Sequence, residues 1–417
     1  MALDVLDEVS SAHAIGRSTD HILASRLDSV GEAVALQIAD RARQLRAEGR
    51  SIVSLSTGEP DFPTPKNIKD AAIRAINDNF TKYTAAEGIM ELRSALAEKF
   101  ARDNGIVTTA ERVIISSGGK HALSNALLAL VDPGDEVIIP SPCWLSYPAM
   151  VAISEGRVRF VDTHPESDWL MSPAALREAI TPRTKVLMLN TPVNPTSGLY
   201  TEADLMALAE VIEESGIYVI VDELYEKLVF DGRVHFSLGS VREIADRVIT
   251  VNGFSKAYAM TGWRLGYSTG PKEVMEAVGR LQSQMVSHPS SISQKAGLEA
   301  ITGPQESIEE MRLAFERRRN LVVSLLADVP DISFMIPKAA FYVFFDVSKY
   351  LGRFTPGEDL IVTSTELCKY LLDTFGLALV PGDAFNRADA MRLSFAASDA
   401  DIVEGVRRLK LGLASLR

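Results

Sequence analysis

A lysine and an arginine lie eight residues apart on a turn that follows an apolar run. The run, Arg247 to Val251, has the composition of a strand, and Lys256 and Arg264 follow it. The amine of a lysine at a strand end can form a Schiff base with an aldehyde. A guanidinium can bind a phosphate through two parallel hydrogen bonds. Either residue alone would more simply be a surface charge, but together they are candidates for holding a ligand that carries an aldehyde and a phosphate.

Two further segments suit the same kind of ligand. Ser116 to Leu123 has the pattern of a strand, a glycine turn and a helix start, so the backbone N–H groups near Gly119 and Lys120 can bind a phosphate, although such turns also carry glycine for packing. Asp222 ends an apolar run, where a buried carboxylate needs a cation. The N–H of a pyridinium ring supplies one, and Tyr225 can hydrogen-bond a phenolic oxygen on such a ring.

Three other side chains complete the candidate site. Asn194 belongs to a Pro-rich turn, Asn190 to Gly198, and its amide can reach the same phenolic oxygen, although the turn is structural in either case. Trp144 can stack on a planar ring, although a tryptophan in the core is more common. Arg392 lies among apolar residues of a strand-like run, where a buried guanidinium needs a carboxylate. A substrate α-carboxylate would serve.

The elements that must position these residues follow a βα rhythm between about Asn67 and about Ile301. Short β-branched runs alternate there with helical patterns, which predicts a mostly parallel sheet covered on both faces. The runs are Val113–Ser116, Glu136–Ile139, Val158–Val161, Lys185–Leu189, Tyr218–Val221 and Val248–Val251. Ligands of open α/β sheets bind at the carboxyl ends of the strands. The loops that begin at Ser117, Asn190, Asp222 and Asn252 are therefore expected to form one site.

The C-terminal part has a different pattern. A long amphipathic helix, Ser307 to Ala327, precedes two strand-like runs, Phe341–Phe345 and Met391–Phe395, and a closing helix from about Asp399 to Leu416, which predicts a smaller α+β domain. The N-terminal helix pattern Glu32–Gly49 and the strand-like Ile52–Leu55 are expected to pack with it. The predicted divisions are an N-terminal extension (1–26), an N-terminal segment (27–66), a large domain (67–301) and a small domain (302–417). The run Glu316 to Arg319 reads as the solvated face of its helix.

Composition excludes several classes of protein. The 417 residues are 47% hydrophobic and 24% charged, an ordinary composition for a soluble globular protein, and the length predicts two domains. The net charge of −12 argues against nucleic acid or an anionic membrane as the main partner. Cys143 and Cys368 are the only cysteines, which favours a reducing compartment. The six histidines form no metal-binding pair, so no metal is expected, and the absence of a leader pattern or a long apolar stretch predicts a cytoplasmic protein.

Taken together, these motifs resemble the aspartate aminotransferase superfamily, the fold-type I enzymes that depend on pyridoxal phosphate, and most closely the bacterial branch of aspartate and prephenate aminotransferases. The resemblance runs from about Leu27 to the C-terminus. Its motifs are Ser56-Thr-Gly-Glu-Pro-Asp-Phe62, Thr81-Lys-Tyr-Thr84, Ser117-Gly-Gly-Lys120, Asn194-Pro-Thr196, Asp222-Glu-Leu-Tyr225, Ser255-Lys256, Gly262-Trp-Arg264 and Arg392-Leu-Ser394. It implies an α/β fold with a mostly parallel seven-stranded sheet and a smaller α+β domain.

The resemblance also implies a role for each matching residue. Lys256 would form the Schiff base with pyridoxal phosphate, Asp222 would pair with the ring nitrogen, and Tyr225 would bond the phenolic oxygen. The other implied contacts are Asn194 on the phenolic oxygen, Trp144 on the ring, Gly119, Lys120, Ser255 and Arg264 on the phosphate, Tyr83 reaching the phosphate from a second subunit, and Arg392 with the Gly58 backbone on the substrate α-carboxylate. A site shared in this way requires a homodimer.

The substrate is less sharply indicated. A lysine at the position of Lys120 is associated in the matching branch with a distal carboxylate, which favours aspartate, glutamate and their 2-oxo acids in a ping-pong reaction. Against this, Gly31, Ala33 and Ala35 stand where relatives carry polar side chains, which would weaken a dicarboxylate pocket. Aromatic or aliphatic donors and prephenate stay open, as does a C–S lyase of the same fold. A DNA-binding regulator is disfavoured, because the segment before the resemblance is short and acidic.

Overall fold

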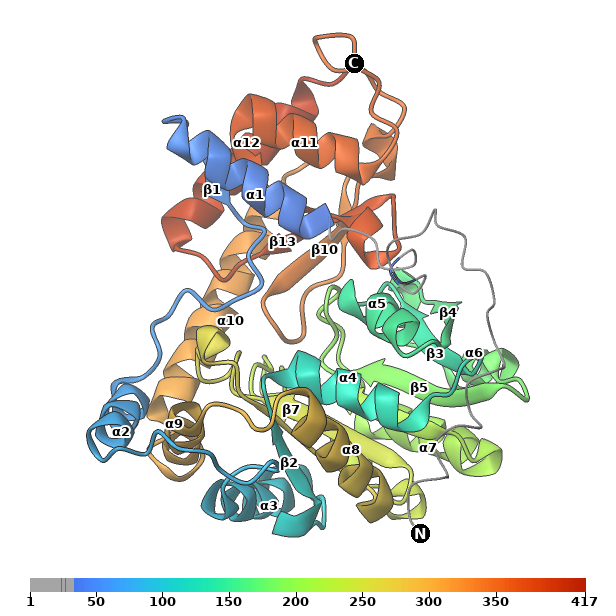
Figure 1. Ribbon diagram of the computed structural model, residues 1–417. Coiled ribbons are helices and arrows are strands. Elements are labelled where there is room, and N and C mark those ends of the chain that lie inside the picture. Colours follow the sequence, from blue (N-terminus) through green and yellow to red (C-terminus); the bar gives the residue numbers. More distant parts are fainter. Residues whose placement is uncertain (1–23, 25–26, 28–33) are drawn as a thin grey trace, which may run out of the picture.

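The computed structural model describes residues 24, 27 and 34–417, with the side chains of 34–36 and 39 left out. Figure 1 shows a large part built on a wide sheet, and above it a smaller part that carries the C-terminus. None of the described helices is both long enough and apolar enough to cross a membrane.

The large part contains a seven-stranded sheet, as predicted. The strands lie in the order β2 (Val113–Ser116), β8 (Gly266–Thr269), β7 (Val248–Gly253), β6 (Tyr218–Asp222), β5 (Thr184–Asn190), β3 (Glu136–Ser141) and β4 (Arg157–Asp162). All the pairs are parallel except the two that β8 forms with β2 and β7. Every predicted run lies in a strand, whereas β8 was not predicted, because Gly266-Tyr-Ser-Thr269 is short and begins with glycine.

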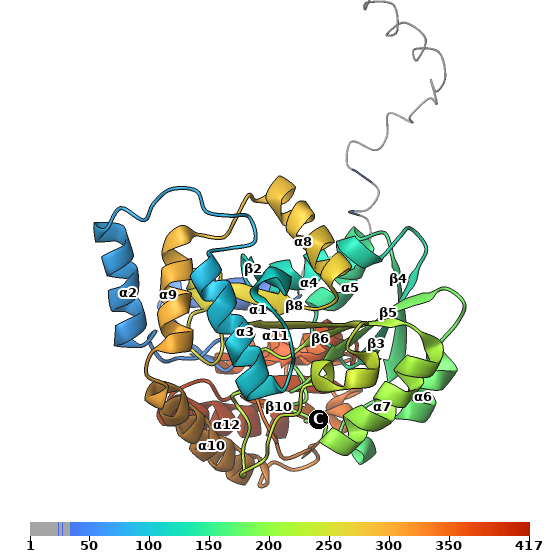
Figure 2. The ribbon, with the colours of Figure 1, turned by 90° about the horizontal axis from the view of Figure 1, so that it is seen from below.

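Helices cover both faces of this sheet, which explains why its central strands, β5, β6 and β7, are buried on both sides. Along β5, Val186 and Met188 pack in a cluster with α4 (Gly119–Leu130), α5 (Ser146–Ile153) and α8 (Lys272–Met285). Leu187 and Leu189 point the other way, toward α6 (Pro173–Ala179) and α7 (Glu202–Ser215). On that second face α3 (Met90–Asn104) and α9 (Ser291–Thr302) cover the β2 end, and α2 (Lys66–Asn77) packs on α9 (Figure 2).

The smaller part combines both ends of the described chain. Its elements are α1 (Val34–Ala47), β1 (Val53–Ser54), α10 (Glu306–Leu326), β9 (Ser333–Phe334), β10 (Tyr342–Asp346), α11 (Ser364–Phe375), β11 (Leu377–Ala378), β12 (Val380–Pro381), β13 (Ala390–Ser394) and α12 (Asp399–Ala414). Strand β1 pairs in parallel with β11, and β12, β13, β10 and β9 form a separate antiparallel sheet. One apolar core joins α1 to α10, α11 and α12. The N-terminal segment thus packs with the C-terminal one, while the exact domain limits stay a prediction.

The run Glu316 to Arg319 corrects one prediction. Two of its arginines are buried rather than solvated, with Arg318 8% and Arg319 3% exposed. Arg318 donates two hydrogen bonds to the carboxylate of Asp61, at 2.7 and 2.9 Å. Arg319 binds the carboxylate of Asp231 in the same paired manner. The prediction was wrong because both carboxylates come from segments distant in the sequence, and a helical pattern alone does not reveal them.

The strand directions place four loops at one edge of the large sheet. Because β8 is antiparallel to both β2 and β7, β2 runs in the same direction as β5, β6 and β7. The residues that follow these four strands therefore meet at a common edge, beneath the smaller part (Figure 1). This is the edge at which the sequence predicted a site.

Candidate active site

The amine of Lys256 lies at the centre of this edge, on the turn that follows β7. Its Nζ donates a hydrogen bond to the backbone carbonyl of Gly58, on the segment that follows β1. Burial of the side chain, together with the nearby guanidinium of Arg392, lowers the pKa of Lys256 to about 8. A useful fraction of the amine is therefore neutral near pH 7 to 8, as a base or a nucleophile requires.

A buried carboxyl group ends the neighbouring strand β6. Asp222 is 5% exposed and accepts hydrogen bonds from the hydroxyl of Tyr147, at 2.8 Å, and from the N–H of Leu224, at 3.1 Å. Burial raises the pKa of Asp222 to about 6, against the opposing effect of these hydrogen bonds. Among the described residues no lysine, arginine or histidine forms an ion pair with it. The carboxylate can therefore accept a cationic N–H from a ligand.

Sequence reasoning missed Tyr147. It lies three residues after Trp144, at the start of α5, and the two rings meet edge to face with centroids 5.4 Å apart. Burial and the adjacent Asp222 raise the pKa of the Tyr147 hydroxyl, which keeps it protonated as a donor. The signal that could have linked it to the site was its place in the same short segment as Trp144, three residues further along the chain.

A buried guanidinium faces the same space from β13. Arg392 is 5% exposed, and its Nη atoms donate to the Oδ1 of Asn194 at 2.9 Å and to the carbonyl of Ser56 at 3.2 Å. Its Nε has no partner, and no carboxylate of the described residues forms an ion pair with it. The ring of Tyr342 lies against the guanidinium, with its centroid 4.2 Å from Cζ, and its hydroxyl is 2.8 Å from that of Tyr225. An anion from a ligand would complete this group.

Tyr342 was another residue that sequence reasoning missed. It lies in the run Phe341–Phe345, which predicted only a strand, and it contacts Tyr225 across 117 positions of the chain. A contact of that separation has no local signature. Burial raises the pKa of both hydroxyls, so both stay protonated at neutral pH.

An anion-binding cradle lies at the start of α4. The helix begins at Gly119 after Gly118, and no side chain caps its first N–H groups. The guanidinium of Arg264 packs on Gly118 so closely that a Cβ there would meet Nη2 at 2.5 Å. A Cβ on Gly266 would lie 2.4 Å from the backbone nitrogen of Gly119. The exposed Arg264 forms no ion pair within the described part of the chain, so its charge is available for a phosphate.

The remaining predicted residues differ in placement. The exposed Lys120 holds its Nζ 5.0 Å from the ring centroid of Trp144, and Ser255 is buried one residue before Lys256. Tyr83 is 90% exposed, and its one recorded ring contact is with His288, apart from the other predicted residues. The structure thus brings together Gly58, Gly119, Lys120, Trp144, Asn194, Asp222, Tyr225, Ser255, Lys256, Arg264 and Arg392, but not Tyr83. Gly31 and Ala33, and the side chain of Ala35, lie outside the described part.

The arrangement suits proton transfer at a carbon atom next to a carboxylate. A partly neutral amine, a buried carboxyl group without a cation, a buried guanidinium without a carboxylate and an uncapped anion cradle converge on one edge. The carboxyl group, the guanidinium and the Arg264 of the cradle each lack a partner of opposite charge among the described residues. A ligand with a cationic ring nitrogen and a phosphate, together with a substrate carboxylate, would supply all three partners.

Comparison with known proteins gives a consistent result. Residues 50–409 match the family model described as aminotransferase class I and II. The aspartate/prephenate aminotransferase of Cereibacter sphaeroides is 43% identical over 396 residues, covering 94% of this chain and 99% of that protein. The crystal structure of an aspartate aminotransferase from Rhizobium meliloti superposes with a TM-score of 0.92 at 41% identity, covering 95% and 100% of the two chains. The aspartate aminotransferase of Thermus thermophilus with maleate superposes with a TM-score of 0.88 at 41% identity, covering 94% and 100%.

Proposed function

Because this chain belongs to the family of class I and II aminotransferases, which depend on pyridoxal phosphate, we propose that it moves the amino group of aspartate or glutamate to a 2-oxo acid such as 2-oxoglutarate or oxaloacetate. The two half-reactions use one site in turn, so the kinetics are ping-pong. The observation that carries the proposal is the partly neutral Lys256 between a buried carboxyl, Asp222, and a buried guanidinium, Arg392, neither of which has an ionic partner among the described residues.

The described residues fit pyridoxal phosphate. When bound, this cofactor offers an aldehyde to an amine, an N–H cation to a carboxylate and a phosphate to an anion site, and its ring withdraws electrons from the substrate Cα. Lys256 would hold the aldehyde and Asp222 the ring nitrogen, since the buried carboxyl accepts only neutral donors from the described part of the protein. The backbone N–H groups of Gly119 and Lys120, together with Ser255 and Arg264, would hold the phosphate in the cradle that a Cβ on Gly118 would fill. Trp144 would cover the ring, with Tyr225 and Asn194 on its phenolic oxygen.

Lys256 moves the proton in this proposal. With the substrate amino acid in the site, the neutral Nζ of Lys256 would remove the proton from Cα of the amino acid. The lowered pKa, about 8, makes this neutral form accessible near physiological pH, whereas a lysine with its ordinary pKa would stay protonated. The carbonyl of Gly58 accepts a hydrogen bond from Nζ and so orients the amine.

Two cations bind the two ends of the substrate. Arg392 binds the α-carboxylate. Its buried guanidinium lies against the ring of Tyr342, and its Nε has no hydrogen-bond partner among the described residues, so it needs an anion. Lys120 binds the distal carboxylate of aspartate or glutamate, since its exposed ammonium lies over Trp144 without an ion pair among the described residues. The relative from Thermus thermophilus was solved with maleate, a dicarboxylate, which supports a site for two carboxylates.

The quaternary arrangement and the compartment are also proposals. Tyr83 is 90% exposed and apart from the site of its own chain, which supports a homodimer in which it reaches the phosphate of the second subunit. Both cysteines are free and buried, which supports a reducing, cytoplasmic compartment.

Borohydride trapping tests the assignment of Lys256. Protein incubated with pyridoxal phosphate is reduced and digested, and the peptides are analysed by mass spectrometry. We expect the reduced cofactor on Lys256 and on no other lysine, and its loss in Lys256→Ala, while Lys272→Ala, an exposed control, retains it. Modification of another lysine in place of Lys256 would refute the assignment. Release of pyruvate and ammonia from cystathionine, without formation of a 2-oxo acid from aspartate, would instead identify a C–S lyase.

A further inference from the structure

The segment that carries Asp222 and Tyr225 also carries two buried carboxylates that the proposed reaction does not use. Asp222 and Tyr225 face the site, whereas Glu223 and Glu226 are directed into the interior beside α3. Their side chains are 0% and 7% exposed. Two buried carboxylates are costly unless they are paired and hydrogen-bonded, so their surroundings require an explanation.

Glu226 is paired with a fully buried lysine. Lys99, on α3, is 1% exposed, and its Nζ donates to the carboxylate of Glu226 and, at 2.7 Å, to the Oδ1 of Asn104. The Nδ2 of Asn104 donates to Glu226 at 2.7 Å and to Glu223 at 3.3 Å. Burial alone would raise the pKa of Glu226. The charges of Lys99 and Lys227 lower it below its usual value, so this carboxyl stays ionised.

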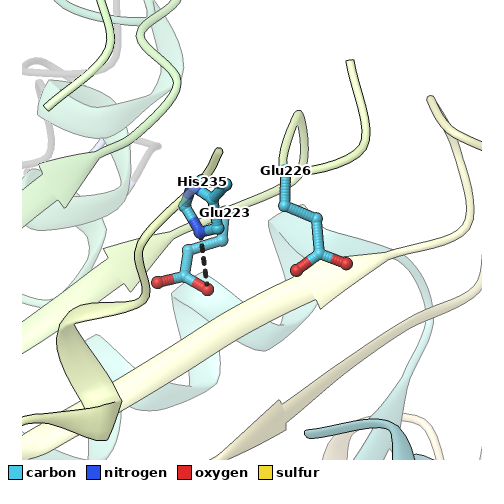
Figure 3. Close-up of side chains that lie close together, drawn as sticks. All are labelled: Glu223, Glu226 and His235. Atoms are coloured by element: carbon cyan, nitrogen blue, oxygen red, sulfur yellow. Dashed lines mark ion pairs between the residues drawn. The ribbon is translucent and has the colours of Figure 1, made fainter. Parts of the chain in front are cut away.

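Glu223 is held from the other side by Ser237 and His235. The hydroxyl of Ser237 donates to Glu223 at 2.7 Å, and the Nε2 of His235 lies 3.3 Å from its Oε2 (Figure 3). His235 is 7% exposed on its side chain and has no other recorded partner. It borders a cavity of about 390 Å³, from which protons can reach it. Burial lowers the pKa of His235, but the two glutamates outweigh this effect and raise it above its usual value.

The charges in this network are nearly balanced without a metal ion. Glu223, Glu226 and His235 are a group of described residues whose possible ligand atoms lie within 4.8 Å of one another. The ammonium of Lys99, however, already occupies the position of a cation beside Glu226, and the oxygens of Glu223 already accept from Ser237 and Asn104. The two carboxylates and Lys99 leave a net charge of about −1, which protonation of His235 cancels.

The carboxylate of Glu223 lies directly behind the candidate active site. Glu223 follows Asp222 in the chain, and its negative charge adds to the rise in the pKa of Asp222. Other charged or titratable side chains also face Asp222, Glu223 and Glu226. Around Asp222 these are Tyr147 and Lys256, and around Glu223 and Glu226 they are Asp103, Lys227, Tyr258 and Tyr267.

We propose that Glu223 is a positioning residue for Asp222, and that the buried network of Lys99, Asn104, Glu226, Ser237 and His235 holds its carboxylate in place and fixes the net charge behind the cofactor site. While His235 is neutral, the net negative charge of the network strengthens the hold of Asp222 on a cationic ring nitrogen and raises the proton affinity of basic groups in the site. The inference rests on the proposed pairing of Asp222 with the ring of pyridoxal phosphate.

The test uses substitutions that change the network charge in opposite directions. The readout is the pH at which the visible absorption band of the cofactor-loaded protein changes, measured by spectral titration. Glu223→Gln and Glu226→Gln each remove a negative charge and should lower this midpoint by about 0.8 to 1.2 pH units, as expected for a unit charge about 10 to 15 Å away at an effective dielectric constant near 20. Lys99→Met removes a positive charge and should raise it by a similar amount.

Controls separate an electrostatic effect from a structural one. The double variant Lys99→Met with Glu226→Gln restores the net charge and should return the midpoint to the native value, and it avoids the uncompensated buried carboxylate of Lys99→Met alone. Glu310→Gln, the same change at an exposed position, should leave the midpoint unchanged. Dialysis against a chelator should also leave it unchanged, and a shift on metal removal would overturn the proposal in favour of a metal site.

Two other outcomes have distinct meanings. A visible band whose midpoint stays the same in both glutamine variants, or shifts in the same direction for gain and loss of charge, would refute the role of Glu223 alone. The absence of any visible band in the native protein with pyridoxal phosphate would refute the proposed function and this inference with it.

Discussion

Replacement of Asp222 by asparagine should stabilise the cofactor-free protein while it impairs the enzyme. The folded protein raises the pKa of this carboxyl from 3.8 to about 6. A carboxyl whose pKa is raised by folding opposes folding once it ionises, so stability is highest below pH 3.8 and falls as the pH rises toward 6. Two pKa units correspond to about 3 kcal/mol above pH 6. The Asp222→Asn substitution would remove this cost, and the Tyr147 hydroxyl can accept a hydrogen bond from the new amide.

The assay is urea unfolding of cofactor-free native protein and Asp222→Asn at several pH values. We expect a stability difference near zero at pH 4 that grows to as much as about 3 kcal/mol at pH 7. With cofactor, kcat should fall by about 100-fold or more, because a neutral amide does not keep a ring nitrogen protonated and a buried charge pair contributes about 3 to 5 kcal/mol. A variant that is less stable at pH 7, or equally stabilised at pH 4 and pH 7, would show that Asp222 does not carry the electrostatic cost inferred here.

Three further predictions concern the substrate and phosphate sites. Lys120→Gln should lower kcat/KM for aspartate by about 10- to 100-fold and leave phenylalanine within about threefold, because only a distal carboxylate loses an ionic partner worth about 1.5 to 3 kcal/mol; equal losses for both substrates in steady-state assays would contradict this. Tyr342→Leu should raise KM for every amino acid by about 5- to 30-fold, since the ring supports Arg392 and a buried cation–π contact is worth about 1 to 2 kcal/mol; a loss confined to dicarboxylates would refute this role. Gly266→Ala should weaken cofactor binding in equilibrium dialysis, because its Cβ would meet the nitrogen of Gly119 at 2.4 Å, whereas Gly357→Ala, a control whose Cβ would have its nearest neighbours at 3.6 Å, should not.

The strands and their loops were predictable because their signals are local. Four of the six β-branched runs between Val113 and Val251 end in small, polar or glycine-rich turns, and parallel strands bring such turns to one edge. Strand β8 was not predictable on the same grounds. Its residues, Gly266 to Thr269, form a strand because they pair with β2 and β7, not because of their own propensity.

The missing parts of the site depend on contacts between distant segments. Tyr342 contacts Arg392 and Tyr225 because the fold packs the smaller part against the sheet edge. Lys99 looks like an ordinary charge on a helix until α3 packs beside Glu226. The buried Arg318 has the same origin, since its partner Asp61 lies 257 residues away. The sequence showed which chemical groups were present, but not which charges would be buried together.

A single turnover with aspartate tests the central claim most directly. Protein loaded with pyridoxal phosphate and freed of excess cofactor is mixed with aspartate in the absence of a 2-oxo acid. We expect the visible band to disappear and about one equivalent of oxaloacetate to form per site, with no change in Lys256→Ala. A band that aspartate and glutamate leave unchanged, but that phenylalanine or another monocarboxylic donor removes, would contradict the dicarboxylate specificity. A band that no amino acid removes would contradict the aminotransferase reaction itself.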